Sequence, residues 1–277
     1  MSAASRESTA APSELPFFAA LGILSGVYVL LIAAMLVAQA SFTSPGHLWE
    51  ALATPEIQYA IKLSLISCTL TTILSLWVGT ALGYLMSRYE FRGKALIDAI
   101  IDVPIVLPPL VIGLALLILF QTAPLRWFED NIMNVTFAIP SVIIAQFAVA
   151  CAFAVRTMRV TFDQISPREE AVALTLGCSR AQAFWRVVLP DARRGLLAAA
   201  TLAWARALGE FGPILVFSGA TRMRTEVLPT TVYLELSIGN IEAAVAVSLL
   251  MVLAAVTVLV ILRYAGADAS LAKAPRV

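Results

Sequence analysis

Six long apolar stretches, separated by short polar segments, dominate the chain. They cover residues 17–40, 57–87, 99–120, 135–155, 195–219 and 243–264. A membrane-spanning helix needs about 20 predominantly apolar residues, and each stretch is long enough. The runs are continuous rather than alternating, which is typical of helices and not of a transmembrane β-barrel. The pattern therefore predicts an all-α polytopic membrane protein with six transmembrane helices.

The composition excludes several classes of soluble protein. Of the 277 residues, 60% are hydrophobic and only 13% are charged, about half the charged share of a soluble domain. This excludes a cytosolic enzyme and a disordered protein. The net charge of +1 leaves no basic excess for nucleic acid. One His and three isolated Cys predict neither a metal site nor a disulfide framework.

The distribution of basic residues predicts the orientation of the chain. Fourteen of the nineteen Lys and Arg lie in the amino-terminal tail, in residues 87–98, in residues 156–194 and from Arg263 onward. The other three loops carry three between them. Cytoplasmic loops are enriched in Lys and Arg. We therefore expect both termini to be cytoplasmic.

The domain organisation is simple. Residues 1–14 are small and polar, and we expect a disordered cytoplasmic tail. One transmembrane domain should cover residues 15–265, with a long cytoplasmic loop at 156–194. Residues 266–277 should form a short cytoplasmic tail. The first apolar stretch has no convincing signal-peptide cleavage site after it, so it should be a retained helix.

The long loop, residues 156–194, contains the start and end of a short helix. Ser166 suits the N-cap, Pro167 suits the first helical position, and Glu169 completes a capping box. Gly177 should end the helix, because a left-handed C-terminal cap favours glycine. The loop should then lie against the cytoplasmic face of the membrane.

A second short helix should follow, capped by Ser179 and stopped by Pro190. Two interpretations of the loop remain open from its residues alone. It is either an ordinary structured connection or a docking element that presents a short helix to a groove on a soluble partner.

The loop resembles the EAA loop of ABC-importer permeases. The resemblance rests on the run from Glu170 to Gly177 and on Leu189-Pro190 farther along, although Val172 stands where the commoner motif has its second alanine. In that family the loop is a coupling helix held in a cleft of the ATPase subunit. The residues that the resemblance assigns to docking are Glu169, Glu170, Ala171, Gly177, Leu189 and Pro190.

Two further segments narrow the resemblance. Residues 102–113 are similar to the third span of molybdate and sulfate permeases, and residues 205–212 are similar to the fifth. The resemblance covers most of residues 57–264. It implies the type I ABC importer permease fold in the cytoplasmic membrane and transport of a tetrahedral oxyanion. The motifs do not settle whether that ion is molybdate, tungstate or sulfate.

The resemblance also implies partners and cofactors. Two copies of the chain would form a homodimer around the path, two ATP-binding cassette subunits would dock on the coupling helices, and an external binding protein would deliver the oxyanion. The chain would bind no cofactor itself and catalyse no reaction. ATP and magnesium would be held by the partner ATPase, because the sequence has no phosphate-binding G-x-x-x-x-G-K-[ST] motif.

Arg206 and Glu210 are ionisable residues inside the fifth apolar stretch. They are four positions apart and therefore share a helix face. A charged group at membrane depth is costly, so both should face protein or water rather than lipid. One hypothesis places them on the translocation path, where Arg206 would offset the charge of a passing anion. The other makes them a structural ion pair.

Prolines and glycines should interrupt two of the spans. Pro104, Pro108 and Pro109 should break the third, and Phe211-Gly212 should lie in a similar break in the fifth. Broken helices at membrane depth occur only where protein or a water-filled cavity covers them. A gate and a packing kink both fit this pattern.

Molybdate or tungstate is the ion that the resemblance favours, and two alternatives to an ATP-driven importer of these ions remain open. The first is a permease of the same architecture for sulfate, ferric ion or another solute. The second, from a different class, is an ion-driven secondary transporter. Inverted repeats with paired broken helices are typical of that class, and the sequence contains no such symmetry that we detect.

Overall fold

The computed structural model describes residues 15–271; the predicted tail 1–14 and the last part, 272–277, of the predicted tail 266–277 lie outside the described residues. The chain divides into two units, residues 1–44 and 45–277. The first unit holds α1 (Leu15–Ser41), whose described side chains are almost all exposed although they are apolar. A helix that is apolar all round suits a lipid environment.

The second unit is built of helices and the turns that join them. Its helices are α2 (Pro45–Ala53), α3 (Pro55–Arg88), α4 (Lys94–Val106), α5 (Pro109–Phe120), α6 (Ala123–Asn131), α7 (Ile139–Gln164), α8 (Pro167–Thr175), α9 (Arg180–Ala183), the π-helix η1 (Phe184–Val188), α10 (Leu189–Asp191), α11 (Arg193–Leu208), α12 (Gly212–Phe217), α13 (Leu228–Ser237) and α14 (Ile241–Leu271). The last helix runs past residue 266, where the carboxy-terminal tail was predicted to begin.

Four of the predicted spans are single helices, namely α1, α3, α7 and α14. By length and composition these four can cross a membrane, and α4 with α5 makes a fifth candidate if the bent pair is one span. The predicted fifth span, residues 195–219, is divided between α11 and α12. The prediction of an all-α chain with several spans is therefore confirmed for the described residues, but six continuous helices are not observed.

The third span breaks because of its prolines, and α4 and α5 meet at an angle of 115°. Leu107 precedes a proline and takes the extended conformation that this position favours. Pro108 is the N-cap of α5 and Pro109 its first residue. Pro104, in contrast, remains inside α4. The break predicted for this stretch therefore lies at Leu107-Pro108, not at Pro104.

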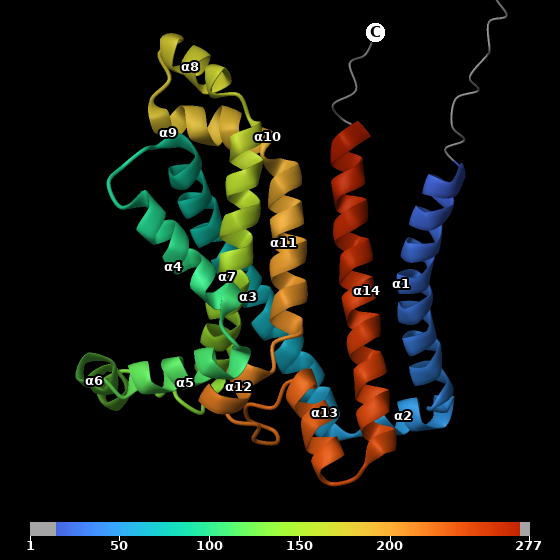
Figure 1. Ribbon diagram of the computed structural model, residues 1–277. Coiled ribbons are helices and arrows are strands. Elements are labelled where there is room, and N and C mark those ends of the chain that lie inside the picture. The colour runs from blue at the N-terminus through green and yellow to red at the C-terminus, as the bar shows by residue number, and fades with distance from the viewer. Residues whose placement is uncertain (1–14, 272–277) are drawn as a thin grey trace, which may run out of the picture. The chain divides into compact units, whose positions relative to one another are not determined.

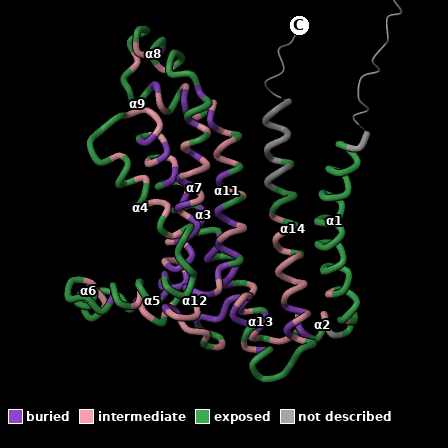
Figure 2. Tube along the Cα trace, in the orientation of Figure 1, coloured by how far each residue is buried: buried purple, intermediate pink, exposed green. Residues whose placement is uncertain are grey.

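α3, α7 and α11 form the centre of the second unit. They lie side by side in Figure 1, and Figure 2 shows their facing surfaces as the main buried region. Gly79 makes the close approach of α3 to α7 possible, because a Cβ atom there would lie 3.0 Å from the Cβ of Ala154. The exposed surfaces of α3 are largely apolar, as expected for a helix that also faces lipid.

The segment α8 to α10 lies at one end of the unit, and α2 and α13 lie at the other (Figure 1). The predicted start of α8 is confirmed, with one difference. The Ser166 hydroxyl accepts a hydrogen bond from the backbone N–H of Arg168, at 3.3 Å, and not from that of Glu169. Gly177 ends this helical segment with φ +88°, the left-handed conformation predicted for it.

The second short helix differs from its prediction at its end. Ser179 begins it with a capping box shared with Gln182, but Pro190 does not stop it. The backbone N–H of Leu189 bonds to the carbonyl of Phe184, five residues back, so a π-helical turn precedes the proline. Helical structure continues through α10 to α11. Pro190 lies in the first turn of α10, a position that needs no N–H donor.

Candidate functional site

The two broken spans are packed directly against each other. A Cβ atom at Gly212, the first residue of α12, would lie 2.9 Å from the Cβ of Pro109 and 3.0 Å from the backbone nitrogen of Leu110. A Cβ atom at Gly113 of α5 would lie 2.8 Å from the Cα of Pro213. The structure therefore brings Pro109 and Gly212, both predicted as gate residues, into one contact that only glycine permits.

The other predicted gate residues lie in different places. Pro108 belongs to the same turn as Pro109. Phe211 lies in the break before α12, and its ring centre is 5.5 Å from that of Tyr233 on α13. Pro104 lies apart from this contact and lines a small cavity of about 190 Å³ between α4 and α7.

Arg206 and Glu210 form an ion pair, as one of the two hypotheses for them expected. Arg206 Nη2 lies 2.9 Å from Glu210 Oε2, and the Glu210 side chain is 1% exposed. Neither carboxylate oxygen of Glu210 accepts a hydrogen bond within the described chain. The Arg206 guanidinium also lies over the ring of Phe153 on α7. Glu210 is thus a buried carboxylate whose charge is offset mainly by one arginine.

A buried side-chain amide, which was not identified from the sequence, holds the end of α11. Gln146 of α7 donates from Nε2 to the carbonyl of Ala207, at 3.2 Å. Its Oε1 accepts a hydrogen bond from the Thr71 hydroxyl of α3, also at 3.2 Å. Gln146 therefore links three helices one turn before Glu210. A single amide inside the apolar run 135–155 was the available signal.

The predicted docking residues divide into an inward and an outward set. Glu170 points toward the bundle: the Tyr84 hydroxyl donates to its Oε1 at 2.6 Å, and Arg88 Nε lies 3.6 Å from its Oε2. Arg88 also donates to the carbonyl of Ile165, just before α8. The outward or partly exposed docking residues are Glu169, Ala171, Gly177, Leu189 and Pro190.

A network of charges joins α4 to α7. Asp98 lies 3.1 Å from Arg156 Nη1 and 2.5 Å from Arg159 Nη1, and Arg156 also donates to both carboxylate oxygens of Asp102. Asp98 and Asp102 are four positions apart and Arg156 and Arg159 are three apart, so each pair lies on one face of its helix. This spacing was the signal in the sequence for the network.

A second charged cluster lies at the end of the unit opposite α8. Arg222 pairs with Glu226 at 3.3 Å and with Glu235 at 2.6 Å, and Asn240 donates to Glu235. Burial raises the pKa of Glu226, and the nearby Arg222 charge offsets only part of that rise. The cluster fixes the loop before α13 to the start of α14.

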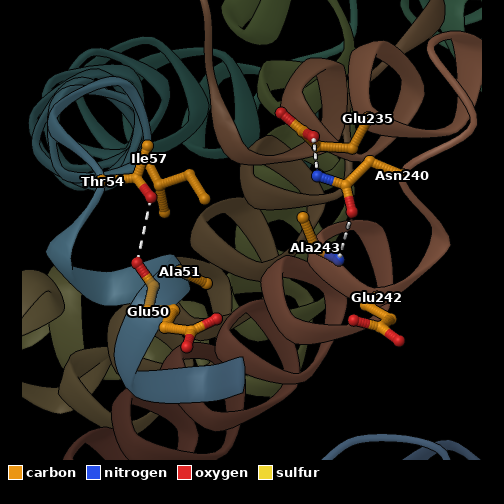
Figure 3. A pocket seen from close by; sticks show the side chains of 8 residues that line it. All are labelled: Glu50, Ala51, Thr54, Ile57, Glu235, Asn240, Glu242 and Ala243. Carbon is orange, nitrogen blue, oxygen red and sulfur yellow. Dashed lines mark hydrogen bonds between the residues drawn. The ribbon is translucent and has the colours of Figure 1, made fainter. Parts of the chain in front are cut away.

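A small open pocket borders this cluster (Figure 3). It has a volume of about 220 Å³ and is lined by Glu50, Ala51, Thr54, Ile57, Glu235, Asn240, Glu242 and Ala243. The carboxylates of this pocket do not come together as a metal-binding group within the described residues. The pocket therefore gives this end of the unit an acidic hollow rather than a metal site.

Comparisons with known proteins agree with one another. The family described as "Binding-protein-dependent transport system inner membrane component" matches residues 76–268. The sulfate transport system permease protein CysT of Escherichia coli is 31% identical over 233 residues, which is 83% of this chain and 84% of that protein. The molybdenum transport system permease protein ModB of Mycobacterium tuberculosis is 33% identical over 249 residues, 89% of this chain and 93% of that one.

A third relative and two solved structures extend the comparison. The molybdate/tungstate transport system permease protein WtpB of Pyrococcus abyssi is 35% identical over 202 residues, 73% of this chain and 77% of that one. A chain of a bacterial alginate ABC transporter, in complex with its periplasmic protein, superposes with a TM-score of 0.74 at 13% identity, covering 91% of this chain and 93% of that one. A chain of the MetNI methionine ABC transporter gives 0.53 at 17% identity, covering 80% and 91%. These structures share the fold.

Proposed function

This chain belongs to the family of inner-membrane components of binding-protein-dependent transport systems, and from that premise we propose that it carries a tetrahedral oxyanion through an ATP-driven importer. The observation that carries the proposal is the alignment, over 73–89% of the chain, with permeases named for sulfate, molybdenum and molybdate/tungstate. Molybdate or tungstate is the proposed ion, and sulfate is the alternative.

The exposed side of α8 is the proposed docking surface for the ATPase. Glu169 and Ala171 are exposed on this helix, while Glu170 is tied to Tyr84 of α3. A displacement of α8 would therefore be transmitted to α3 through the short, charge-assisted hydrogen bond between Glu170 and Tyr84. In this proposal ATP and magnesium are bound by the ATPase, and this chain contributes no catalytic residue.

The proposed assembly has two copies of this chain with the path between them and one ATPase subunit on each α8. An external binding protein delivers the oxyanion at the end that holds α2 and α13. The contact of Gly212 with Pro109 is the proposed gate element, because broken helices occur at membrane depth only where protein or a water-filled cavity covers them.

The test is uptake by the reconstituted transporter. The chain, its cognate ATPase and its cognate binding protein are placed in liposomes, and uptake of labelled molybdate and of labelled sulfate is measured. We expect molybdate uptake that requires ATP and the binding protein. Uptake of sulfate alone would replace the proposed ion with the alternative. Uptake driven by an ion gradient without ATP would support a secondary transporter and contradict the proposal.

Gly177→Val is expected to reduce uptake and ATPase association at least tenfold while the chain still reaches the membrane. Gly177 has φ +88°, and a β-branched residue is strained in that conformation. The strain would tilt α8 away from its docking orientation. The measurement is the amount of ATPase that copurifies with the chain, together with uptake.

Gly93→Val is the matched control, because Gly93 has φ +90° and a Cβ atom there would also enter open space. It lies at the start of α4, outside the segment α8 to α10. Equal losses in both variants would indicate general backbone strain and contradict the docking assignment.

A further inference from the structure

An apolar groove runs along one side of α3, between this helix and η1. Its volume is about 610 Å³, and it is lined by Leu76, Trp77, Thr80, Ala81, Phe184, Trp185, Leu189 and Leu196. Thr80 supplies the only hydroxyl among these side chains. Trp77 is 73% exposed and Trp185 66% exposed. The groove is therefore a large apolar surface that the described residues of the second unit leave uncovered.

The groove continues toward the end of the unit that holds α8 and α9. A second cavity of about 330 Å³ shares Ala81, Phe184 and Trp185 with the first and extends to Tyr89 and Arg180. From Leu76 to Tyr89, α3 rises roughly 20 Å. This is somewhat more than one leaflet of the hydrocarbon core, which is about half of ~30 Å.

The polar end of the groove is built from two side chains. Arg180 Nη1 donates a hydrogen bond to the Tyr89 hydroxyl, at 3.1 Å, and its guanidinium carbon lies 6.0 Å from the centre of the Tyr89 ring. Arg180 is exposed. The residues that line the two cavities include this one cation and no carboxylate. The mouth of the groove is therefore positive, while its interior is apolar.

The apolar interior and the positive mouth of the groove follow each other in the same order as the acyl chains and the anionic headgroup of a phospholipid. α3 is one of the helices able to cross a membrane, so the apolar part of the groove lies along the acyl chains. Arg180 and Tyr89 lie where the helix ends, at the depth of the headgroups. Basic pockets beside spans on the cytoplasmic side suit anionic headgroups, and amphipathic aromatic rings prefer the interface.

The π-helical turn contributes to the shape of the groove. Because Leu189 bonds to the carbonyl of Phe184 five residues back, the turn is wider than in an α-helix, and such turns are frequent at functional sites. Phe184 packs edge-to-face on Tyr84, with ring centres 4.8 Å apart. Phe184 thus closes the bottom of the groove, while Trp185 forms its rim.

We propose that this groove binds a phospholipid with an anionic headgroup, the acyl chain lying between α3 and η1 and the phosphate at Arg180 and Tyr89. The site borders α9 and η1, inside the segment α8 to α10, and it does not depend on which solute is transported. A bound lipid would fill a surface that otherwise exposes two tryptophans.

The test uses the complete transporter, purified with its ATPase and analysed by native mass spectrometry. Equal amounts of phosphatidylglycerol and phosphatidylcholine are added at the same acyl length. We expect retained phosphatidylglycerol in excess of phosphatidylcholine. Arg180→Gln should lower that preference about fivefold, the effect of one basic residue near an anionic lipid. The substitution removes the charge and keeps an N–H donor on a shorter side chain.

Ala81→Trp tests the apolar part of the groove. Ala81 is exposed and lines both cavities, so a large ring there fills the groove without entering the core. It should lower retention of both lipids. Arg126→Gln is the matched charge control, since Arg126 is exposed on α6, far from α9 in Figure 1, and it should leave retention unchanged.

Three results would overturn the proposal. The first is equal retention of the two lipids by the unmodified transporter. The second is an Arg180→Gln effect no larger than that of Arg126→Gln. The third is an Ala81→Trp variant that separates the two permease copies while lipid retention stays unchanged, which would assign the groove to a second copy of the chain.

Discussion

Gly212→Leu is expected to abolish uptake, and Gly212→Ala to reduce it, because any side chain at this position collides with α5. The nearest atoms would be the Cβ of Pro109 at 2.9 Å and the backbone nitrogen of Leu110 at 3.0 Å. The ring of Pro109 is joined to the backbone and cannot rotate away. Either α5 or α12 must therefore move. Inserting extra carbon atoms into a packed contact typically costs about 1–3 kcal/mol. Uptake is measured per assembled transporter, so a loss of assembly is seen separately.

Gly113→Ala tests the same contact from the other helix, since its Cβ atom would lie 2.8 Å from the Cα of Pro213. Gly26→Leu is the control, because Gly26 belongs to α1, which places no side chain of its own within 4 Å of where a Cβ would stand. It should transport like the unmodified chain. Wild-type uptake by Gly212→Leu would show that α5 and α12 need not touch during transport, and Gly212 would then be removed from the gate.

Removing either charge of the Arg206–Glu210 pair is expected to lower assembly and uptake far more than removing both charges together. Glu210 is 1% exposed and its carboxylate lies 2.9 Å from Arg206. Arg206→Gln leaves an uncompensated buried carboxylate, and breaking a buried pair in this way typically costs about 3–5 kcal/mol. Arg206→Gln with Glu210→Gln leaves two neutral amides of similar size and should recover assembly and uptake.

The measurement is the amount of assembled transporter and the uptake per transporter, for the two single variants and the double variant. Recovery of both quantities in the double variant supports an ion pair that fixes the end of α11. A double variant that assembles normally and does not transport would instead place Arg206 on the path of the anion. Phe153→Leu gives a related control, because it removes the ring beneath the guanidinium and leaves both charges.

The sequence was sufficient to predict the spans that are continuous helices. α1 and α3 begin and end within two residues of the predicted bounds, because a run of about 20 apolar residues has few other stable forms in a membrane. α7 continues to Gln164 and α14 to Leu271, beyond the ends predicted at 155 and 264. The breaks in the spans were predicted from prolines, but the angle between the two helices at a break was not. The 115° angle between α4 and α5 depends on what each helix packs against, and a single sequence does not contain that information.

The candidate sites were predictable to the extent that they are local. Arg206 and Glu210 are one helical turn apart, so their pairing follows from spacing. The contact of Gly212 with Pro109 joins positions about a hundred residues apart, and nothing in either motif specifies the other. Glu170 illustrates a third case: the motif marked the residue, but only the fold shows that it turns inward to Tyr84.

The charges between α4 and α7 have a consequence for how the protein enters the membrane. Asp98 and Asp102 belong to an apolar helix, and a charged side chain carried into the membrane without a partner is costly. Their partner Arg156 is synthesised 54 residues after Asp102. While the ribosome is still making α7, α4 carries two carboxylates with no arginine to meet them. We expect α4 to remain beside the insertion machinery during that interval and to be released into lipid together with α7, as one neutralised pair.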